Sequence, residues 1–258
     1  MIEPIVFYDV PQAVPEGADP SERAWSPHTW KTRYALNMKK LPYTTTWIEY
    51  PDMAGELQKY GVAQEKRLYR GVPKYTVPTI IDPNTKRAVA DSEAIALYLD
   101  DHYPDIGPRF FPPHTRSLQC AMVQRTRDLT GMVFRQIVYE TWRVMTPRAQ
   151  PYIRESREIL LGVKLEDSAA KGEARKVALK EIADWLEETR GFIRANGEHA
   201  MFLGGERPVY ADADIAGTLF WVRKVAGADS DVWRTIVTAS EGHWAKFMEA
   251  FKEYETVA

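Results

Sequence analysis

Short apolar runs mark several segments in the first third of the chain. Residues 4–10 enclose the run Ile5-Val6-Phe7, which predicts a buried strand. Residues 44–50 are β-branched and aromatic, a composition typical of a second strand. Two further strands are expected at 77–81 and 87–90, joined by a turn. With helices between the strands, this order predicts a mixed four-stranded sheet.

Between these strands, apolar residues recur at the spacing typical of helices. An apolar stripe recurs at every fourth position after Ser26-Pro27 and consists of Trp30, Tyr34 and Met38. Because Ser is a preferred N-cap and Pro suits the first helical position, a helix is expected to begin there. A second helix, capped by Ser92, is expected to end before Pro104. The segment 51–74 is expected to be irregular, with a short helix near 55–60.

The pattern changes after Pro104, where strand signals end and helical periodicity remains. Helices are expected at 115–145, 147–162, 171–196, 212–226 and 230–254. We therefore predict an α/β domain at 1–104, a linker at 105–114 and an all-α domain at 115–258.

Composition narrows the class of protein. The 258 residues are 45% hydrophobic and 27% charged, with a formal net charge of -2, so a sizeable core is expected and nothing favours nucleic-acid binding. The single cysteine, Cys120, excludes an internal disulfide, and we expect it to be a buried thiol in a reducing compartment. Neither a signal peptide nor a membrane-spanning run is evident, which predicts a cytoplasmic protein with no membrane partner.

Candidate chemistry gathers in three motifs: Trp25-Ser26-Pro27-His28, Thr76-Val77-Pro78-Thr79-Ile80 and Asp91-Ser92-Glu93-Ala94-Ile95-Ala96. The first and third begin helices, whose N-termini favour anions. The second begins a strand, where proline fixes the backbone. Together the three motifs suit a small anionic thiol peptide.

These motifs, with Phe202–Gly205 and Tyr210–Asp212, resemble those of glutathione transferases. The stretch Ala24–Leu36, together with Val77–Ile80 and Asp91-Ser92, resembles the fungal etherase-like (FuA) class, which is related to bacterial glutathione-dependent β-aryl-etherases. The resemblance implies a glutathione transferase fold, with a thioredoxin-like α/β domain followed by an all-α domain. It also implies glutathione as co-substrate, no metal, and a homodimer.

One position departs from the family pattern. The second-domain capping box of the family places Ser or Thr three residues before its aspartate, and here that residue is Val209. The helix beginning near Asp212 should therefore lose the side-chain half of its cap, worth about 1 kcal/mol of local stability.

Ser26 is the catalytic candidate, because a hydroxyl at a helix N-terminus can stabilise the glutathione thiolate. The alternative is a plain N-cap, which Ser26-Pro27 explains without any ligand. The nearest rival is Tyr8, where other transferase classes keep a catalytic Tyr; its structural alternative is a buried phenol. Position 26 is not Cys, which argues against a glutaredoxin-like thiol exchange.

The resemblance also implies the glutathione-binding residues. Pro78 is expected to be cis, with the backbone of Val77 pairing with the cysteinyl part of glutathione. Asp91 would pair with the γ-glutamyl ammonium, and Ser92, at a helix N-terminus, with the γ-glutamyl carboxylate.

Three basic residues are candidates for the cation that binds the glycyl carboxylate. Lys74 is preferred because it lies just before Val77, and Lys66 and Arg67 compete with it.

The electrophile site is expected to have an aromatic wall carried by the helical domain. Its candidate residues are Phe134, Tyr139, Trp142 and Tyr152, although aromatic residues at helical spacing are more often core. Tyr8, at the end of the first strand, is a further substrate-binding candidate. Such a wall suits bulky hydrophobic aromatic compounds, including phenolic ones of lignin or wood origin.

Three functions remain open. The first is a transferase whose thiolate attacks an electrophilic carbon, an ether-bearing carbon or a peroxide. The second is a ligandin, a carrier of aromatic molecules with weak catalysis. The third is a non-catalytic interaction module.

Overall fold

The computed structural model describes residues 2–62, 65–69 and 72–258, with the backbone alone described for 65–69 and 72–74. The chain divides into two compact units. Unit 1 comprises Met1–Phe110, Met145–Tyr152 and Tyr254–Ala258; unit 2 comprises Phe111–Val144 and Ile153–Glu253. The sequence division into 1–104 and 115–258 is continuous, whereas unit 1 also takes in two short segments from much later in the chain.

Unit 1 is built on the mixed sheet expected from the apolar runs. Its strands are β1 (Ile5–Asp9), β2 (Tyr43–Trp47), β5 (Thr79–Asp82) and β6 (Arg87–Ala90), in the order β2-β1-β5-β6. β1 and β2 are parallel, and the other neighbours are antiparallel. Ile5, Phe7 and Ile80 are fully buried, which explains why these runs pack as strands. The four-stranded prediction is confirmed.

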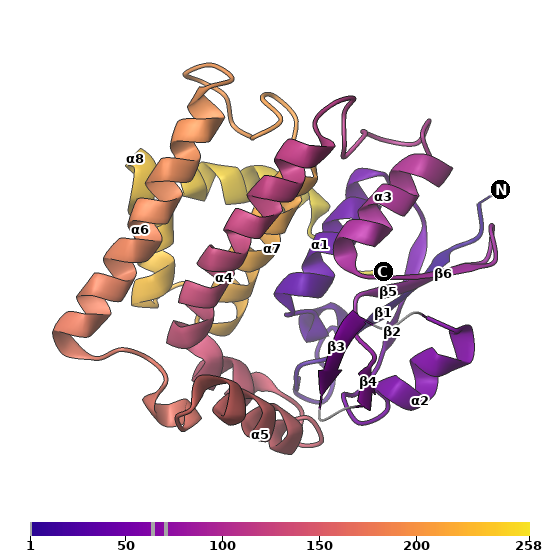
Figure 1. The fold of residues 1–258 in the computed structure, drawn as a ribbon, viewed down its shortest axis with the longest axis horizontal. Coiled ribbons are helices and arrows are strands. Elements are labelled where there is room, and N and C mark those ends of the chain that lie inside the picture. Colours follow the sequence, from indigo (N-terminus) through magenta and orange to yellow (C-terminus); the bar gives the residue numbers. More distant parts are fainter. Residues whose placement is uncertain (1, 63–64, 70–71) are drawn as a thin grey trace. The chain divides into compact units, whose positions relative to one another are not determined.

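Helices cover the sheet of unit 1 (Figure 1). They are α1 (Pro27–Met38), α2 (Met53–Leu57) and α3 (Ser92–His102), with short 3₁₀ turns at Pro20–Arg23 and Gln58–Tyr60. The stripe of α1 is buried as expected, but the helix is also buried at polar positions of other faces, including Thr29, Lys31 and Arg33. Burying charged residues requires partners, and those of Arg33 define the site described below.

Two local expectations for unit 1 are corrected. The segment expected to be irregular contains a two-stranded hairpin, β3 (Glu65–Tyr69) and β4 (Val72–Lys74), outside the main sheet. The N-cap of α3 is Asp91, not Ser92, because the Asp91 carboxylate accepts hydrogen bonds from two backbone N–H groups of the first turn. Ser92 is the first helical residue.

The stretch expected to be a linker is anchored to α1. Lys39, fully buried at the end of α1, pairs with Asp100 at 3.1 Å. Its ammonium also donates, at 3.1–3.3 Å, to the carbonyls of Tyr103, Ile106 and Pro108. At Gly107, φ is +64°, and a Cβ would lie 2.6 Å from the Lys39 Cα. Only glycine allows the chain to pass this close.

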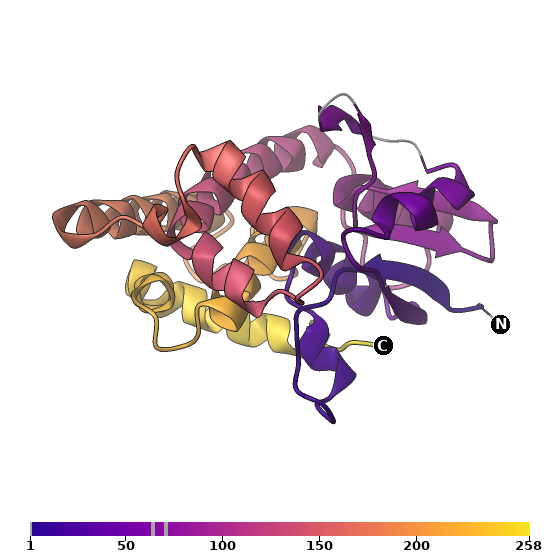
Figure 2. The same ribbon diagram turned by 90° about the horizontal axis from the view of Figure 1, so that it is seen from below.

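Helices make up the regular secondary structure of unit 2, as predicted, apart from an isolated antiparallel bridge between Phe202 and Gly205. Its helices are α4 (Arg116–Val144), the greater part of α5 (Gln150–Leu161), α6 (Gly172–Arg194), α7 (Tyr210–Val225) and α8 (Asp231–Phe251), with 3₁₀ turns at Leu165–Asp167 and Lys252–Tyr254. Every residue of α7 from Tyr210 to Val222 is buried, so α7 forms the centre of this unit. Figures 1 and 2 show α8 breaking into two parts, at the non-helical residues 239–242.

Two side chains of unit 2 refine the sequence expectations. Cys120 is half-buried, not fully buried, on α4. Val209 makes no side-chain cap to α7, as expected, but Asp212 accepts from the Val209 backbone N–H at 2.9 Å and keeps its half of the capping box. No helix in the described part of the chain is long and apolar enough to cross a membrane.

Candidate active site

Ser26 is the N-cap residue of α1, but its side chain does not cap the helix. Its backbone is extended (φ -67°, ψ 128°), and its carbonyl accepts the first helical hydrogen bond from the N–H of Trp30 at 3.0 Å. The hydroxyl makes no capping hydrogen bond, and the residue is 5% exposed. A serine used only as a cap would bond an N–H of the first turn. The Ser26 hydroxyl is therefore not used by the helix it begins.

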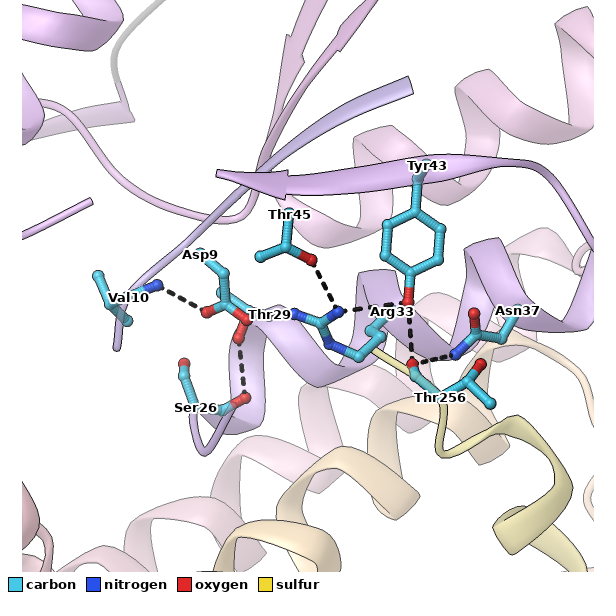
Figure 3. A network of polar contacts seen from close by, with 9 residues as sticks. All are labelled: Asp9, Val10, Ser26, Thr29, Arg33, Asn37, Tyr43, Thr45 and Thr256. Atoms are coloured by element: carbon cyan, nitrogen blue, oxygen red, sulfur yellow. Dashed lines mark hydrogen bonds and ion pairs between the residues drawn. The ribbon is translucent and has the colours of Figure 1, made fainter. Parts of the chain in front are cut away.

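A buried polar network lies beside Ser26 (Figure 3). Thr29 Oγ1 donates to the Ser26 carbonyl at 3.2 Å, and its hydroxyl also lowers the pKa of the neighbouring Asp9 carboxyl. Asp9 ends β1 and pairs with Arg33 at 2.7 Å, both side chains being fully buried. Arg33 also donates to Thr45 at 3.1 Å. The network therefore connects the first strand, the second strand and the start of α1.

Arg33 is held in an aromatic enclosure. Its guanidinium carbon lies 4.9–5.8 Å from four ring centroids, those of Phe7, Trp30, Tyr43 and Trp47. Each ring face attracts the cation. Burial raises the pKa of Asp9, and the facing Arg33 opposes that rise. Arg33 and Asp9 therefore compensate each other's burial, as two buried opposite charges must.

The other two motifs meet at the end of the sheet where β5 begins and β6 finishes; this end is called the sheet edge below. The Val77–Pro78 peptide bond is cis, as the family resemblance implies. The backbone N–H of Asp91 donates to the Pro78 carbonyl at 3.2 Å, and β5 pairs with β6 through Thr79 and Ala90. Since Tyr8 pairs with Thr79 in the same register, the end of β1 reaches this edge as well.

The backbone at this edge has two features that suit a ligand. Among the described residues, the N–H and C=O groups of Val77 have no hydrogen-bond partner. Asp91 has φ +80°, a conformation that costs a non-glycine residue about 1–3 kcal/mol. Both capping bonds of Asp91, to the N–H groups of Glu93 and Ala94, use the same carboxylate oxygen. Ser92 is half-buried at the helix N-terminus.

Tyr8 faces a different set of residues from Ser26. Its hydroxyl lies 3.1 Å from a Glu56 carboxylate oxygen and 3.1 Å from the Tyr60 hydroxyl. Burial is the main reason that the Tyr8 pKa is raised, and the hydrogen bonds to Tyr60 and Glu56 add to it. Because the Tyr8 proton already has acceptors in Glu56 and Tyr60, the hydroxyl is poorly placed to donate to a thiolate.

The three candidate cations for the glycyl carboxylate all lie on the β3–β4 hairpin. Lys74 pairs with Glu65 in the backbone register of the β3–β4 hairpin. The side chains of Lys74, Lys66 and Arg67 lie outside the described part of the chain.

The proposed aromatic wall divides into separate ring pairs. Tyr139 and Trp142 stack on α4, with centroids 5.7 Å apart and planes at 16°. The Arg154 guanidinium lies 4.1 Å from the Trp142 centroid. Phe134 instead lies 6.5 Å from Trp221 of α7.

Tyr152 belongs to unit 1, where its ring stacks on that of Tyr50 with centroids 5.4 Å apart. The four aromatic candidates from 134 to 152 are all half-buried, so each keeps some ring surface exposed.

The sequence analysis missed Asp9, Thr29 and Arg33. Two signals could have found them. Thr29 and Arg33 are four positions apart and so share one face of α1, and Asp9 is a charged residue at the end of an apolar strand. The amphipathic pattern alone gives no reason to bury either charge.

The geometry combines a free hydroxyl at a helix N-terminus with a strand-edge backbone and a capped second helix. The described residues contain no group of His, Cys, Asp and Glu side chains able to hold a metal ion. Within those residues, the chemistry offered to a ligand is hydrogen bonding and helix-dipole stabilisation of anions.

Known proteins match this chain along its length. The glutathione S-transferase N-terminal domain family matches residues 25–102, and the C-terminal domain family matches residues 117–254. Glutathione transferase GSTFuA3 from Phanerochaete chrysosporium is 40% identical, with a TM-score of 0.91 over the full length of both chains. These matches confirm the family resemblance expected from the motifs, including its FuA class.

Two further similar proteins also carry glutathione S-transferase names. The glutathione S-transferase CsGST63524 of Ceriporiopsis subvermispora, solved in complex with glutathione, is 37% identical with a TM-score of 0.89 over 99% of each chain. The glutathione S-transferase-like protein ustS of Aspergillus flavus is 29% identical over 96% of this chain and 89% of its own length.

Proposed function

The chain belongs to the glutathione S-transferase family, and from this premise we propose that Ser26 activates glutathione for transfer to hydrophobic aromatic electrophiles. The observation that carries the proposal is the Ser26 hydroxyl, which stands at the N-terminus of α1 and makes no capping bond. It can donate to a sulfur bound in front of the helix. The thiolate then forms a C–S bond with the electrophile as the leaving group departs with its electron pair.

The energies available at this position are sufficient. A free thiol has a pKa of about 8.5, and lowering it by two units requires about 2.7 kcal/mol of preference for the thiolate. A hydrogen bond to a charged group contributes about 1.5–3 kcal/mol. A helix N-terminus adds about 0.3–1 kcal/mol. One hydroxyl at the start of α1 can therefore supply most of the shift.

The remainder of glutathione would bind along the edge shared by Pro78 and Asp91. The backbone of Val77, which has no partner among the described residues, suits pairing with the cysteinyl N–H and C=O of glutathione, as in an added strand. Asp91 keeps one carboxylate oxygen for the γ-glutamyl ammonium, because the other caps α3. Ser92 and the first-turn N–H groups suit the γ-glutamyl carboxylate. Lys74 remains the proposed partner of the glycyl carboxylate.

The electrophile would be a bulky hydrophobic aromatic compound, such as a phenolic compound derived from lignin or wood. The half-buried Tyr139–Trp142 stack supports this choice, because it offers ring surface beside the Arg154 cation. The same observation supports a second function, ligandin-type binding of aromatics without turnover. Phe134, Tyr152 and Tyr8 are the further proposed wall residues.

Comparing Ser26→Ala with Tyr8→Phe tests this assignment. Each variant removes one hydroxyl from unit 1, and conjugation of glutathione to 1-chloro-2,4-dinitrobenzene provides the rate. We expect Ser26→Ala to lower kcat/KM about 10- to 100-fold at neutral pH, and Tyr8→Phe to lower it less than threefold. The opposite order would assign the thiolate to Tyr8. Binding of glutathione and an aromatic ligand by a wild type that shows no turnover would leave the carrier function.

A further inference from the structure

We propose that Thr29 and Asp9 are positioning residues for Ser26, holding its backbone so that its hydroxyl faces the glutathione sulfur. This inference rests on the proposed function of Ser26. It assigns a role in catalysis to a buried hydroxyl and a buried ion pair that do not themselves contact the ligand.

Thr29 is the link between the ion pair and Ser26. Its Oγ1 donates to the Ser26 carbonyl at 3.2 Å, and Thr29 lies beside the Asp9 carboxyl (Figure 3), whose pKa its hydroxyl lowers. Thr29 is fully buried, so water does not compete for the bond to Ser26. Because its single proton is given to the Ser26 carbonyl, the firmer link from Asp9 to this helix is the ion pair with Arg33, which lies on α1 with Ser26 as its N-cap.

Asp9 is fixed from two further directions. Its Oδ1 accepts the backbone N–H of Val10 at 2.7 Å, and its Oδ2 accepts from Arg33 Nη2 at 2.7 Å. Arg33 is fixed in turn by the hydroxyls of Tyr43, at 3.3 Å, and Thr45, at 3.1 Å. The carboxylate has little freedom to move, so it is a rigid reference point for the start of α1.

Stability alone is a weak reason for this arrangement. Replacing a buried ion pair with apolar residues of similar volume is often neutral or stabilising, because two charges must be desolvated. Asp9 and Arg33 are both fully buried. What the pair does fix is the position of α1, which Ser26 begins, against the end of β1, because Arg33 lies on α1 and Asp9 on β1.

Ser26 needs such a restraint because its hydroxyl has no bond to the helix. The direction of its Cα–Cβ bond depends on the backbone, which is held by the bonds of its carbonyl to the Trp30 N–H and to Thr29. A displacement of about 1 Å at a reacting group can cost about 100-fold in rate. Loss of the Thr29 bond should therefore weaken the hydrogen bond from Ser26 to the sulfur.

The test compares Thr29→Val, which removes only the hydroxyl, with Thr29→Ser, which keeps it. Thr32→Val is the matched control, because Thr32 is a fully buried threonine of the same helix whose hydroxyl has no partner among the described residues. The pKa of glutathione bound to each full-length variant is measured from thiolate absorbance. Glutathione affinity and thermal stability are recorded alongside it.

We expect Thr29→Val to raise the pKa of the bound thiol by about one unit, which lowers the thiolate fraction at neutral pH about threefold. Thr29→Ser should return the value to within about 0.3 units of wild type, and Thr32→Val should leave it unchanged. An unchanged thiol pKa in a folded Thr29→Val overturns the inference. A simple loss of stability would not move the thiol pKa of the folded complex.

Two further variants keep the outcomes separate. If Thr29→Val does not fold, Asp9→Asn is titrated instead, and an unchanged thiol pKa there overturns the inference. Ser26→Ala is titrated beside them. If the bound thiol has the same pKa in Ser26→Ala as in wild type, the proposed function itself is rejected. If its pKa rises in Ser26→Ala but not in Thr29→Val, only the positioning role is rejected.

Discussion

A serine hydroxyl at a helix start can satisfy the first turn or a ligand, and Ser26 and Ser230 make opposite choices. Ser230, the N-cap of α8, accepts the N–H of Trp233 at 3.2 Å and so caps its helix. Ser26 makes no such bond. Both residues are favoured N-caps by sequence, and only the structure distinguishes them. That contrast is the residue-scale basis for assigning chemistry to Ser26.

Asp212 illustrates how a buried residue can carry pH dependence. It is fully buried and accepts three backbone N–H groups, those of Leu203, Gly204 and Val209, at 2.7–3.2 Å. Burial nevertheless raises the pKa of Asp212 to about 7, and the three hydrogen bonds oppose that rise. Between about pH 4, where an unfolded aspartate titrates, and about 7, the folded chain retains a proton that the unfolded chain has lost.

The free energy of unfolding should therefore fall as pH rises through this window, and Asp212→Asn should remove that component. His243 acts in the opposite sense. Burial is the main reason that the pKa of His243 is lowered to about 4. Its contribution to the free energy of unfolding therefore rises with pH between about 4 and about 6.5. The wild-type slope alone is thus ambiguous, and urea unfolding of wild type and variant at pH 5 and pH 8 is needed. Identical slopes for both proteins would contradict the assignment.

At the scale of elements, the tail Tyr254–Ala258 belongs to unit 1. Asn37 of α1 donates to the carbonyls of Tyr254, at 2.6 Å, and Thr256, at 2.8 Å. The Tyr43 hydroxyl of β2 donates to the same Thr256 carbonyl at 2.9 Å (Figure 3). Since Tyr43 also accepts from Arg33, the tail adjoins the network that supports Ser26.

Truncation after Glu253 should lower the free energy of unfolding by about 2–4 kcal/mol, because several partly buried hydrogen bonds are lost at about 0.5–1.5 kcal/mol each. It should also reduce activity, through α1. Glu255→Ala is the control, since it keeps the tail backbone and should cost less than about 1 kcal/mol. Denaturant unfolding checks both values. A truncated chain as stable as the control would mean that the tail does not hold α1.

Elements with a clear period could be predicted from the sequence, and those defined by tertiary partners could not. The four sheet strands follow from their apolar runs, and the helices from their spacing. The β3–β4 hairpin was missed because Glu65–Tyr69 lacks alternation and carries three charged residues. Asp91 and Ser92 are both favoured caps, and only the structure shows that the Asp91 carboxylate makes the capping bonds, to the N–H groups of Glu93 and Ala94.

The candidate site was predictable only in part for a related reason. Ser26, Val77-Pro78 and Asp91-Ser92 lie at the starts of elements, where sequence signals are strongest. Charged residues such as Asp9 and Arg33 are normally expected at the solvent-exposed surface. Each is buried here only because the other is present to pair with it. A pattern read along one chain does not contain that pairing.

At the scale of the whole molecule, both domain families of glutathione S-transferases are present in one chain. Family resemblance leads us to expect a two-fold symmetric homodimer, the commonest oligomer of soluble proteins. Sedimentation equilibrium at micromolar concentration should give twice the mass of the chain. A monomer at every concentration that retains full activity would contradict this expectation and would show that one chain contains a complete site.

The most direct measurement is the ultraviolet thiolate absorbance of bound glutathione across pH, for wild type and Ser26→Ala. The account predicts a wild-type thiol pKa about two units below the free value of about 8.5, with most of that shift lost in the variant. A bound thiol that titrates at its free value in the wild type, or equally low in both proteins, would contradict the claim that Ser26 activates glutathione.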